Sequence, residues 1–236
     1  MNELPEGFPR YSPVGDSALL LEFGERVSPA LNARVHALDR WLKADLFPGI
    51  TACVPGYASL LVLYDLLKVN GGQVRTWLEE RWRSCPFEDS QQSGKIVIPV
   101  RYGGEDGPDL DFVARYHDIS PEEVVRRHTT PTYVVAMMGF TPGFPYLLGL
   151  DPALATPRLD DPRTLVPAGS VGIAGEQTGI YPLDSPGGWQ LIGRISEKIF
   201  DLERDPPFLL SPGDEVMFVA AEGSTVQWAC WSHKRL

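Results

Sequence analysis

The middle of the chain is unusually dense in glycine and proline, which restricts the structures that it can form. Residues 139–193 contain ten glycines and eight prolines. Such a density destabilises helices, whereas short strands joined by tight turns tolerate both residue types. Apolar runs of strand length then occur at Leu191–Ile195, Val216–Ala220 and Val226–Trp231, and the turn sequence Ser211–Asp214 precedes the second of them. We therefore predict a mainly-β barrel or sandwich for the second half of the chain.

The first hundred residues follow a different pattern, in which strands and helices alternate. The segment from Pro29 to Lys43 carries apolar residues at helical spacing, with Ser28 as the expected N-cap. A second helix is predicted at Gln73–Arg83. Strands are predicted at Ala18–Phe23, Gly49–Val54, Ser59–Tyr64 and Lys95–Arg101. This β-α-β-β-α-β order is the split pattern of ferredoxin-like α+β domains.

A polar stretch without periodicity, Glu88–Gly94, is the predicted linker between two domains. It places the first domain at residues 1–92 and the second at residues 93–236. The strand at Lys95–Arg101 completes the first domain if the split pattern holds, and opens the second domain if the linker ends the first. Further elements are predicted at Asp109–His117 (helix), Ser120–Thr129 (helix) and Tyr133–Met138 (strand).

The charge and the absence of targeting signals narrow the class of protein. The chain has 21 basic and 31 acidic residues, a net charge of -10. Nucleic acid and anionic membranes repel such a surface, so we expect neither as a partner. The sequence shows no apolar run long enough to cross a bilayer and no secretory signal. Three widely spaced cysteines fit a reduced, cytoplasmic protein, with buried thiols favoured over a cysteine nucleophile.

Several kinds of catalytic site are absent from the sequence. It contains no GxxxxGK[ST] phosphate loop and no HExxH or paired Cys/His spacing, so we expect no P-loop and no metal site of its own. Ser170 and Ser185 do not lie in a GxSxG elbow. Met137 and Met138 are not followed by lysine, so the chain is not a biotin carrier.

The glycine- and proline-rich stretch also contains aromatic and polar side chains that could line a binding cleft. Disordered segments are poor in aromatic residues, so ordered loops are indicated. The same aromatic residues could instead form the core of a compact barrel. The candidate substrate-binding residues here are Phe144, Tyr146, Gln177, Thr178, Tyr181, Gly187, Gly188 and Trp189. Gln177, Thr178 and Tyr181 could hydrogen-bond an amide or lactam.

Three arginines are the only lysine or arginine residues between residues 129 and 197: Arg158, Arg163 and Arg194. The planar guanidinium of arginine matches a carboxylate or phosphate. Arg158 is therefore a candidate substrate ligand, and Arg163 and Arg194 are candidate catalytic residues. The alternative for each arginine is a surface ion pair with a nearby carboxylate.

His128 lies just past a predicted helix end. Its imidazole could act as a general acid or base near neutral pH. It could equally cap the helix, because a cation suits the helix C-terminus.

The order of the motifs resembles one family over nearly the whole chain. The segments are GFTPGFPYL (139–147), VPAGSVGIAG (166–175), QTGIYP (177–182) and SPGGWQLIGR (185–194). They are similar to those of the family that includes the 5-oxoprolinase B subunit, allophanate hydrolase subunit 1 and kinase A inhibitor. The resemblance implies a ferredoxin-like domain followed by a cyclophilin-like β-barrel.

The resemblance also implies a function and partners. The expected activity is that of the B subunit of an ATP-dependent 5-oxoprolinase, which opens 5-oxo-L-proline to L-glutamate. Its expected partners are the C subunit, which is similar to allophanate hydrolase subunit 2, and the LamB/YcsF-like A subunit. ATP, with magnesium shared with the partner, is the expected cosubstrate. Alternatives within the family are a subunit of a urea- or allophanate-type carboxyltransferase or amidohydrolase, and an inhibitor of a sporulation-type histidine kinase.

Overall fold

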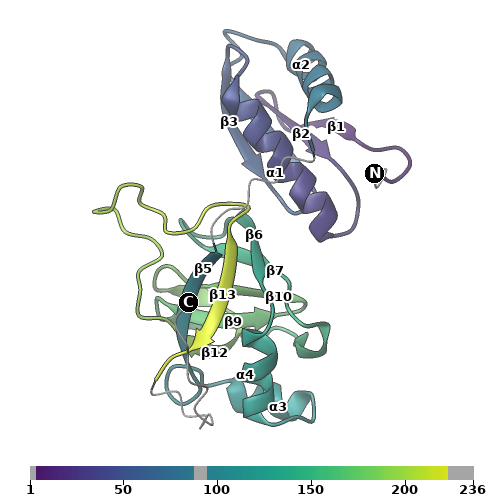
Figure 1. Ribbon diagram of the computed structural model, residues 1–236. Helices are drawn as coiled ribbons and strands as arrows, with labels where there is room; N and C mark the ends of the chain where they lie inside the picture. Colours follow the sequence, from purple (N-terminus) through teal and green to yellow (C-terminus); the bar gives the residue numbers. More distant parts are fainter. Residues whose placement is uncertain (1–3, 88–94, 223–236) are drawn as a thin grey trace, which may run out of the picture. The chain divides into compact units, whose positions relative to one another are not determined.

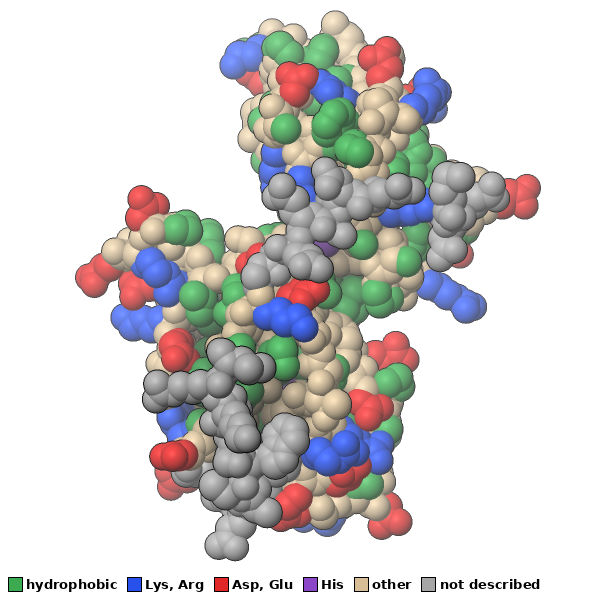
Figure 2. All heavy atoms as spheres, viewed as in Figure 1, with side chains coloured by type: hydrophobic (Ala, Val, Ile, Leu, Met, Phe, Trp, Pro, Cys, Tyr) green, Lys and Arg blue, Asp and Glu red, His purple; other side chains and the backbone are tan. Residues whose placement is uncertain are grey.

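A computed structural model describes residues 4–87 and 95–222 of the chain. The fold divides into two compact units, residues 1–93 and 94–236. The predicted linker at Glu88–Gly94 and the predicted strand at Val226–Trp231 lie outside the described residues. No described helix is long and apolar enough to cross a membrane. On the face shown in Figure 2, acidic and basic side chains are interspersed over both units.

The N-terminal unit is a four-stranded antiparallel sheet with two helices packed against it (Figure 1). The strands lie in the order β1-β2-β4-β3. Their bounds are β1 Arg10–Pro13, β2 Ala18–Glu22, β3 Ile50–Pro55 and β4 Ser59–Tyr64. The helices are α1 (Pro29–Ala44) and α2 (Gly71–Ser84). Apolar residues one helical turn apart on α1, such as Val35 and Leu38, are fully buried against the sheet, which explains why this segment is helical.

The edge of this sheet differs from the split β-α-β-β-α-β pattern. The strand predicted at Lys95–Arg101 does not join it, because these residues belong to the second unit. The position beside β2 is taken by β1, which pairs antiparallel with β2 through a tight turn closed by a hydrogen bond from Val14 N–H to the Ala18 carbonyl. The sequence did not reveal β1, since none of its four residues is buried and no hydrophobic alternation marks it.

The second unit contains a closed barrel of seven strands in the order β10-β7-β6-β13-β5-β12-β9. The expectation of a mainly-β barrel is confirmed. The strand bounds are β5 Lys95–Tyr102, β6 Tyr133–Met138, β7 Pro145–Leu148, β9 Ser170–Ala174, β10 Gln177–Ile180, β12 Gln190–Arg194 and β13 Glu215–Ala220. Neighbouring strands run antiparallel except β5 and β13, which are parallel. A separate two-stranded ribbon pairs β8 (Arg163–Val166) with β11 (Ser185–Gly187).

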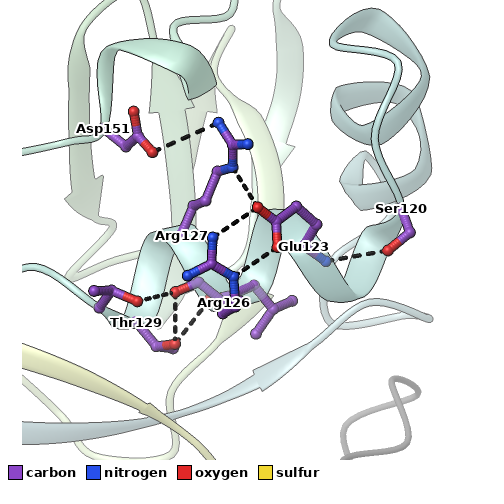
Figure 3. A network of polar contacts seen from close by, with 8 residues as sticks. Ser120, Glu123, Arg126, Arg127, Thr129 and Asp151 are labelled. Carbon is purple, nitrogen blue, oxygen red and sulfur yellow. Dashed lines mark hydrogen bonds and ion pairs between the residues drawn. The ribbon is translucent and has the colours of Figure 1, made fainter.

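Two helices, α3 (Leu110–Tyr116) and α4 (Pro121–Thr129), lie together at one end of the barrel, and a short 3₁₀ turn, η1 (Pro152–Leu154), contacts α4 (Figure 1). The start of α4 is fixed as the sequence predicts, since the Ser120 hydroxyl accepts a hydrogen bond from Glu123 N–H. Glu123 also binds both Arg126 and Arg127, and Arg127 lies 3.8 Å from Asp151 beside η1 (Figure 3). These contacts link α4 to the segment that follows β7.

Candidate active site

A cavity of about 270 Å³ opens in the second unit where the glycine- and proline-rich loops meet. We call it the aromatic pocket. It contains seven of the nine residues predicted to bind substrate. It is lined by Phe140, Phe144, Tyr146, Arg158, Pro162, Tyr181, Pro186, Gly187, Gly188 and Trp189. Segments before β7, before β8, after β10 and around β11 therefore converge on one site, although they are far apart in the sequence.

The walls of the aromatic pocket are held by ring-to-ring contacts. The Phe144 ring lies 4.8 Å from Tyr146, 5.1 Å from Tyr181 and 5.4 Å from Trp189, measured between centroids. Phe144, Tyr181 and Trp189 are all buried. Tilted and edge-to-face pairs of this kind stabilise a packed aromatic cluster beyond the burial of its area. The aromatic residues thus form a small core cluster, and the same cluster lines a cavity; that this cavity binds a ligand stays a prediction.

Gly187 allows this close packing. A Cβ atom at this position would lie 2.8 Å from the Tyr181 ring, too close for any larger residue without displacing the ring. Burial raises the pKa of the Tyr181 hydroxyl above its ordinary value, so the phenol stays protonated at neutral pH and can act as a hydrogen-bond donor.

Arg158 brings a positive charge to the aromatic pocket. Its guanidinium lies 6.0 Å from the centroid of the Trp189 ring. Within the described residues, Arg158 makes no hydrogen bond or ion pair with the protein, although Asp160 and Asp161 are its neighbours in sequence. The alternative of a surface ion pair is therefore not realised for Arg158. The free guanidinium is available to an anionic group of a ligand in the pocket.

Arg163 has a structural anchor instead of a free charge. Its Nη2 donates to both carboxylate oxygens of Asp109, at 2.7 and 2.8 Å, and its Nη1 donates to the Trp189 carbonyl at 3.3 Å. Asp109 also accepts a hydrogen bond from Leu191 N–H at 2.7 Å. The Asp109–Arg163 pair therefore joins the start of α3, the ribbon strand β8 and the start of β12. Through the Trp189 carbonyl it positions the back wall of the aromatic pocket.

His128 does not line the pocket. It is fully buried in the barrel core, where its ring stacks on Phe218 at 4.7 Å. Thr178 donates its hydroxyl proton to the Gly172 carbonyl, so it accepts from His128 Nε2 at 3.0 Å. His128 Nδ1 then accepts from the Tyr102 hydroxyl at 2.8 Å. These contacts define a neutral imidazole that holds the core together. They support neither the acid–base role nor the helix-capping role that the sequence suggested.

Thr178 and Gln177 also lie outside the aromatic pocket. Thr178 is fully buried and is committed to the His128 network. Gln177 is partly exposed at the start of β10, where it pairs with Ala174 of β9. Arg194 lies at the end of β12 and lines a different cavity, described below. The sequence placed these residues near the site because their motifs are adjacent to it. Thr178 is instead buried in the barrel core, and Arg194 lies at the opposite end of β12 from Trp189.

The structure adds Phe140, Pro162 and Pro186 to the pocket lining. Phe140 is 60% exposed and its backbone has a φ of +64°, a conformation rare for a residue other than glycine. Its ring makes edge-to-face contacts with Phe144 and Tyr181. The sequence feature that could have identified Phe140 is its position between Gly139 and Gly143, in a segment where the backbone turns sharply.

The buried His128 predicts how stability depends on pH. Burial lowers the pKa of His128 to about 3, whereas the unfolded chain has a histidine pKa of about 6.5. Between about pH 6.5 and about pH 3 only the unfolded state takes up this proton. As the pH falls through this range, the free energy of unfolding therefore decreases by up to about 1.4 kcal/mol per pH unit. We expect this loss in urea unfolding between pH 6.5 and 5.5, and a smaller loss in His128→Gln. An NMR titration in which the His128 ring protonates near pH 6 in the folded protein would contradict the prediction.

The two cysteines among the described residues do not contribute to the site. Cys53 and Cys85 are buried in the N-terminal unit, and neither forms a disulfide. Burial raises the pKa of both thiols to about 11, so they remain protonated and unreactive. The fold and the cavity define a two-unit protein whose β-barrel carries a pocket with aromatic walls and an arginine, Arg158, that has no hydrogen-bond or ion-pair partner among the described residues.

Comparisons with known proteins show which family shares this architecture. Residues 9–210 match the family described as the carboxyltransferase domain, subdomain C and D. The chain is 46% identical to the 5-oxoprolinase B subunit of Bacillus subtilis over 217 residues, which cover 87% of this chain and 90% of that protein. It is 44% identical to the 5-oxoprolinase B subunit of Escherichia coli O157:H7, with coverage of 87% and 93%. The chain belongs to this carboxyltransferase-domain family, and it is similar over most of its length to 5-oxoprolinase B subunits.

A solved structure of a larger relative matches as well. Urea carboxylase of Kluyveromyces lactis is 26% identical and superimposes with a TM-score of 0.69. The match covers 89% of this chain and 21% of that one. The fold of this chain is therefore also found as one part of a long multidomain enzyme.

Proposed function

We propose that this chain is the B subunit of a 5-oxoprolinase, in which it binds 5-oxo-L-proline in the aromatic pocket. The observation that carries the proposal is the unpaired guanidinium of Arg158 beside the Trp189 ring. The substrate has an apolar ring edge, a lactam and one carboxylate. Aromatic walls suit the ring, and Arg158 suits the carboxylate. The identity of 46% to a B subunit over nearly the full length supports the same assignment.

The reaction needs activation because amide resonance makes the lactam carbonyl a poor electrophile. Transfer of the terminal phosphoryl group of ATP to the lactam oxygen, with ADP leaving, removes that resonance. Water then adds to the ring carbon, the ring C–N bond breaks and the nitrogen takes up a proton. A second water releases phosphate and leaves glutamate. In this scheme Tyr181 donates a hydrogen bond to the ligand, Arg194 interacts with phosphoryl charge, and Arg163 acts by positioning Trp189.

The partners and the setting are part of the proposal. The relatives carry the name of a subunit, so we propose that activity requires the C and A subunits, with ATP and magnesium shared with the partner. The unpaired, buried Cys53 and Cys85 fit a cytoplasmic location. We also propose that the N-terminal unit is a ferredoxin-like variant in which β1 replaces the last strand, and that the barrel is cyclophilin-like.

Urea-type chemistry is the second candidate, because urea carboxylase shares the fold. Arg158 discriminates between the two substrates. Urea is neutral and offers no carboxylate, so a free guanidinium in the pocket has no role in binding it, whereas 5-oxoproline uses it fully. The pocket geometry therefore favours 5-oxoproline over urea. Allophanate also carries a carboxylate, and over this substrate 5-oxoproline is favoured by the 46% identity to a 5-oxoprolinase B subunit. Among the described residues no feature favours the third alternative, inhibition of a histidine kinase.

Reconstitution tests the proposal directly. Glutamate formation from 5-oxoproline and ATP is measured with this chain and the C- and A-type subunits from the same source. We expect full activity only when this chain is present, and background activity when it is omitted. Urea serves as the alternative substrate and is expected to give no ATP turnover. Unchanged glutamate formation after omission of this chain would rule the proposal out.

A further inference from the structure

A second cavity of about 270 Å³ lies next to the aromatic pocket, and the binding of 5-oxoproline does not use it. We call it the cationic pocket. Its charged and polar lining includes Arg101, Arg194, Ser196 and Lys198. Tyr181 is a lining residue of both cavities, so the two pockets are neighbours. Two ligand groups could therefore be held close to each other.

Two arginines of the cationic pocket lie opposite each other on neighbouring strands, an arrangement that is electrostatically unfavourable. Arg101 on β5 and Arg194 on β12 are directly opposite in the antiparallel register. Like charges in such cross-strand positions destabilise a sheet. Arg101 is compensated, since its Nε donates to Asp106 at 2.7 Å and its Nη1 donates to the Ser196 hydroxyl at 2.6 Å. Arg194 has no carboxylate partner within the described residues.

The guanidinium of Arg194 is held in place but left available. Its Nε donates to the Ala168 carbonyl at 2.9 Å, which leaves both Nη groups without a protein acceptor among the described residues. Gly169 makes room beside it. The backbone there has a φ of +83°, and a Cβ atom would lie 2.7 Å from the Ile195 carbonyl and 3.5 Å from the Arg194 side chain. A larger residue at this position would disturb both the turn and the arginine.

The other charges of the pocket do not neutralise Arg194. Lys198 pairs with Asp201 at 3.6 Å and keeps most of its side chain exposed. Glu197 is exposed and lies within ion-pair distance of no described cation. Ser196 accepts from Arg101 and retains its own hydroxyl proton as a donor. The charged group without a carboxylate partner among the described residues is therefore the Arg194 guanidinium, and Arg101 and the Ser196 hydroxyl line the same pocket.

We propose that the cationic pocket binds a phosphoryl group, either free phosphate or the terminal phosphate of a nucleotide. A tetrahedral oxyanion can accept hydrogen bonds from Arg194, Arg101 and Ser196 at once, and it removes the cost of the opposed arginines. Its link to ring opening rests on the proposed function, because a phosphate held beyond Tyr181 lies next to the substrate in the aromatic pocket. The binding itself rests on the geometry of the cationic pocket alone.

Calorimetric titration of the full chain tests the inference. Inorganic phosphate, a magnesium complex of a non-hydrolysable ATP analogue and L-glutamate are titrated separately at constant ionic strength. We expect phosphate to bind, and Arg194→Gln to weaken its affinity about tenfold or more. Lys198→Gln, an exposed substitution that leaves the barrel intact, is expected to weaken it about threefold. Arg115→Gln removes an exposed arginine that lines neither pocket, and is expected to leave the affinity unchanged.

The arms of the titration separate the possible occupants. Competition between phosphate and the ATP analogue, lost in Arg194→Gln, assigns the pocket to a nucleotide. Binding of phosphate without the analogue supports free phosphate. Absence of phosphate binding to the wild-type chain, preference for glutamate, or equal affinity in all variants overturns the inference. Phosphate binding without glutamate formation in the reconstituted system would contradict the proposed function alone. Glutamate formation by a wild-type chain that binds no phosphate in the titration would contradict this inference alone.

Discussion

Replacing Arg158 with glutamine is expected to raise the KM for 5-oxoproline about ten- to thirtyfold in the reconstituted enzyme. Arg158 is the cation of the aromatic pocket. In the described part of the chain its guanidinium lies over the Trp189 ring and forms no hydrogen bond or ion pair, so its replacement breaks none there. A charge-assisted hydrogen bond to the substrate carboxylate contributes about 1.5–3 kcal/mol. Because Arg158 is exposed and solvent screens its charge, we expect a value at the lower end of this range. The measurement is steady-state kinetics with varied 5-oxoproline at saturating ATP.

The split between KM and kcat makes this test specific. A group that binds the carboxylate equally in the ground state and the transition state changes KM and leaves kcat nearly unchanged. Arg115→Gln, which removes an exposed arginine on α3, is the matched control and is expected to change neither parameter. A normal KM in Arg158→Gln would remove this residue from the substrate site. Restoration of KM by Arg158→Lys would show that charge, more than the fork geometry, binds the substrate.

Replacing Asp109 with alanine is expected to destabilise the second unit by about 3 kcal/mol. Asp109 is buried, and its carboxylate accepts two hydrogen bonds from Arg163 and one from Leu191 N–H. Its removal leaves the Arg163 guanidinium and a buried backbone donor without their acceptor. The partial exposure of Arg163 keeps the cost at the lower end of the range for broken buried pairs. Calorimetric unfolding of the full chain would show a lower Tm for the transition of this unit.

A nearby carboxylate provides the control for Asp109. Asp111 is exposed in the first turn of α3, where it makes only the small favourable interaction expected with a helix N-terminus. Asp111→Ala is therefore expected to cost less than about 1 kcal/mol. Catalysis should follow the same order, because Arg163 also holds the Trp189 carbonyl. Equal unfolding temperatures for the two variants would show that the Asp109–Arg163 pair does not hold the pocket wall.

Local patterns predicted most of the regular elements. The helix expected at Pro29–Lys43 is α1, and the expected N-terminus of α4 carries its Ser120 cap. These signals are local, since apolar spacing and capping residues act within a few turns. The edge strand β1 forms a local hairpin with β2, but none of its four residues is buried and no hydrophobic alternation marks it. The assignment of Lys95–Tyr102 to the barrel depends on pairing with β13, which lies far along the chain. No local pattern records such long-range pairing, so the domain to which this strand belongs stayed open in the sequence interpretation.

The site was predictable to a similar degree. Aromatic residues in a glycine-rich stretch indicated Phe144, Tyr146, Tyr181 and Trp189, and all four line one pocket. The chemistry of a side chain did not reveal its hydrogen-bond partners. His128 had the residue type of an acid–base catalyst, but Tyr102 and Thr178 occupy both ring nitrogens inside the barrel. Arg163 and Arg158 have the same side chain, and only the position of Asp109 distinguishes the anchor from the free cation.

The parallel pairing of β5 with β13 has a consequence for synthesis of the protein. The register joins Lys95 to Glu215, so the barrel closes through its first and last described strands. A nascent chain emerging from the ribosome can complete the N-terminal sheet early, because all four of its strands lie within residues 10–64. The barrel must wait until β13 has left the exit tunnel. Until then, β5 presents an unpaired edge, and premature termination before residue 215 would yield a folded N-terminal unit attached to an open, aggregation-prone sheet.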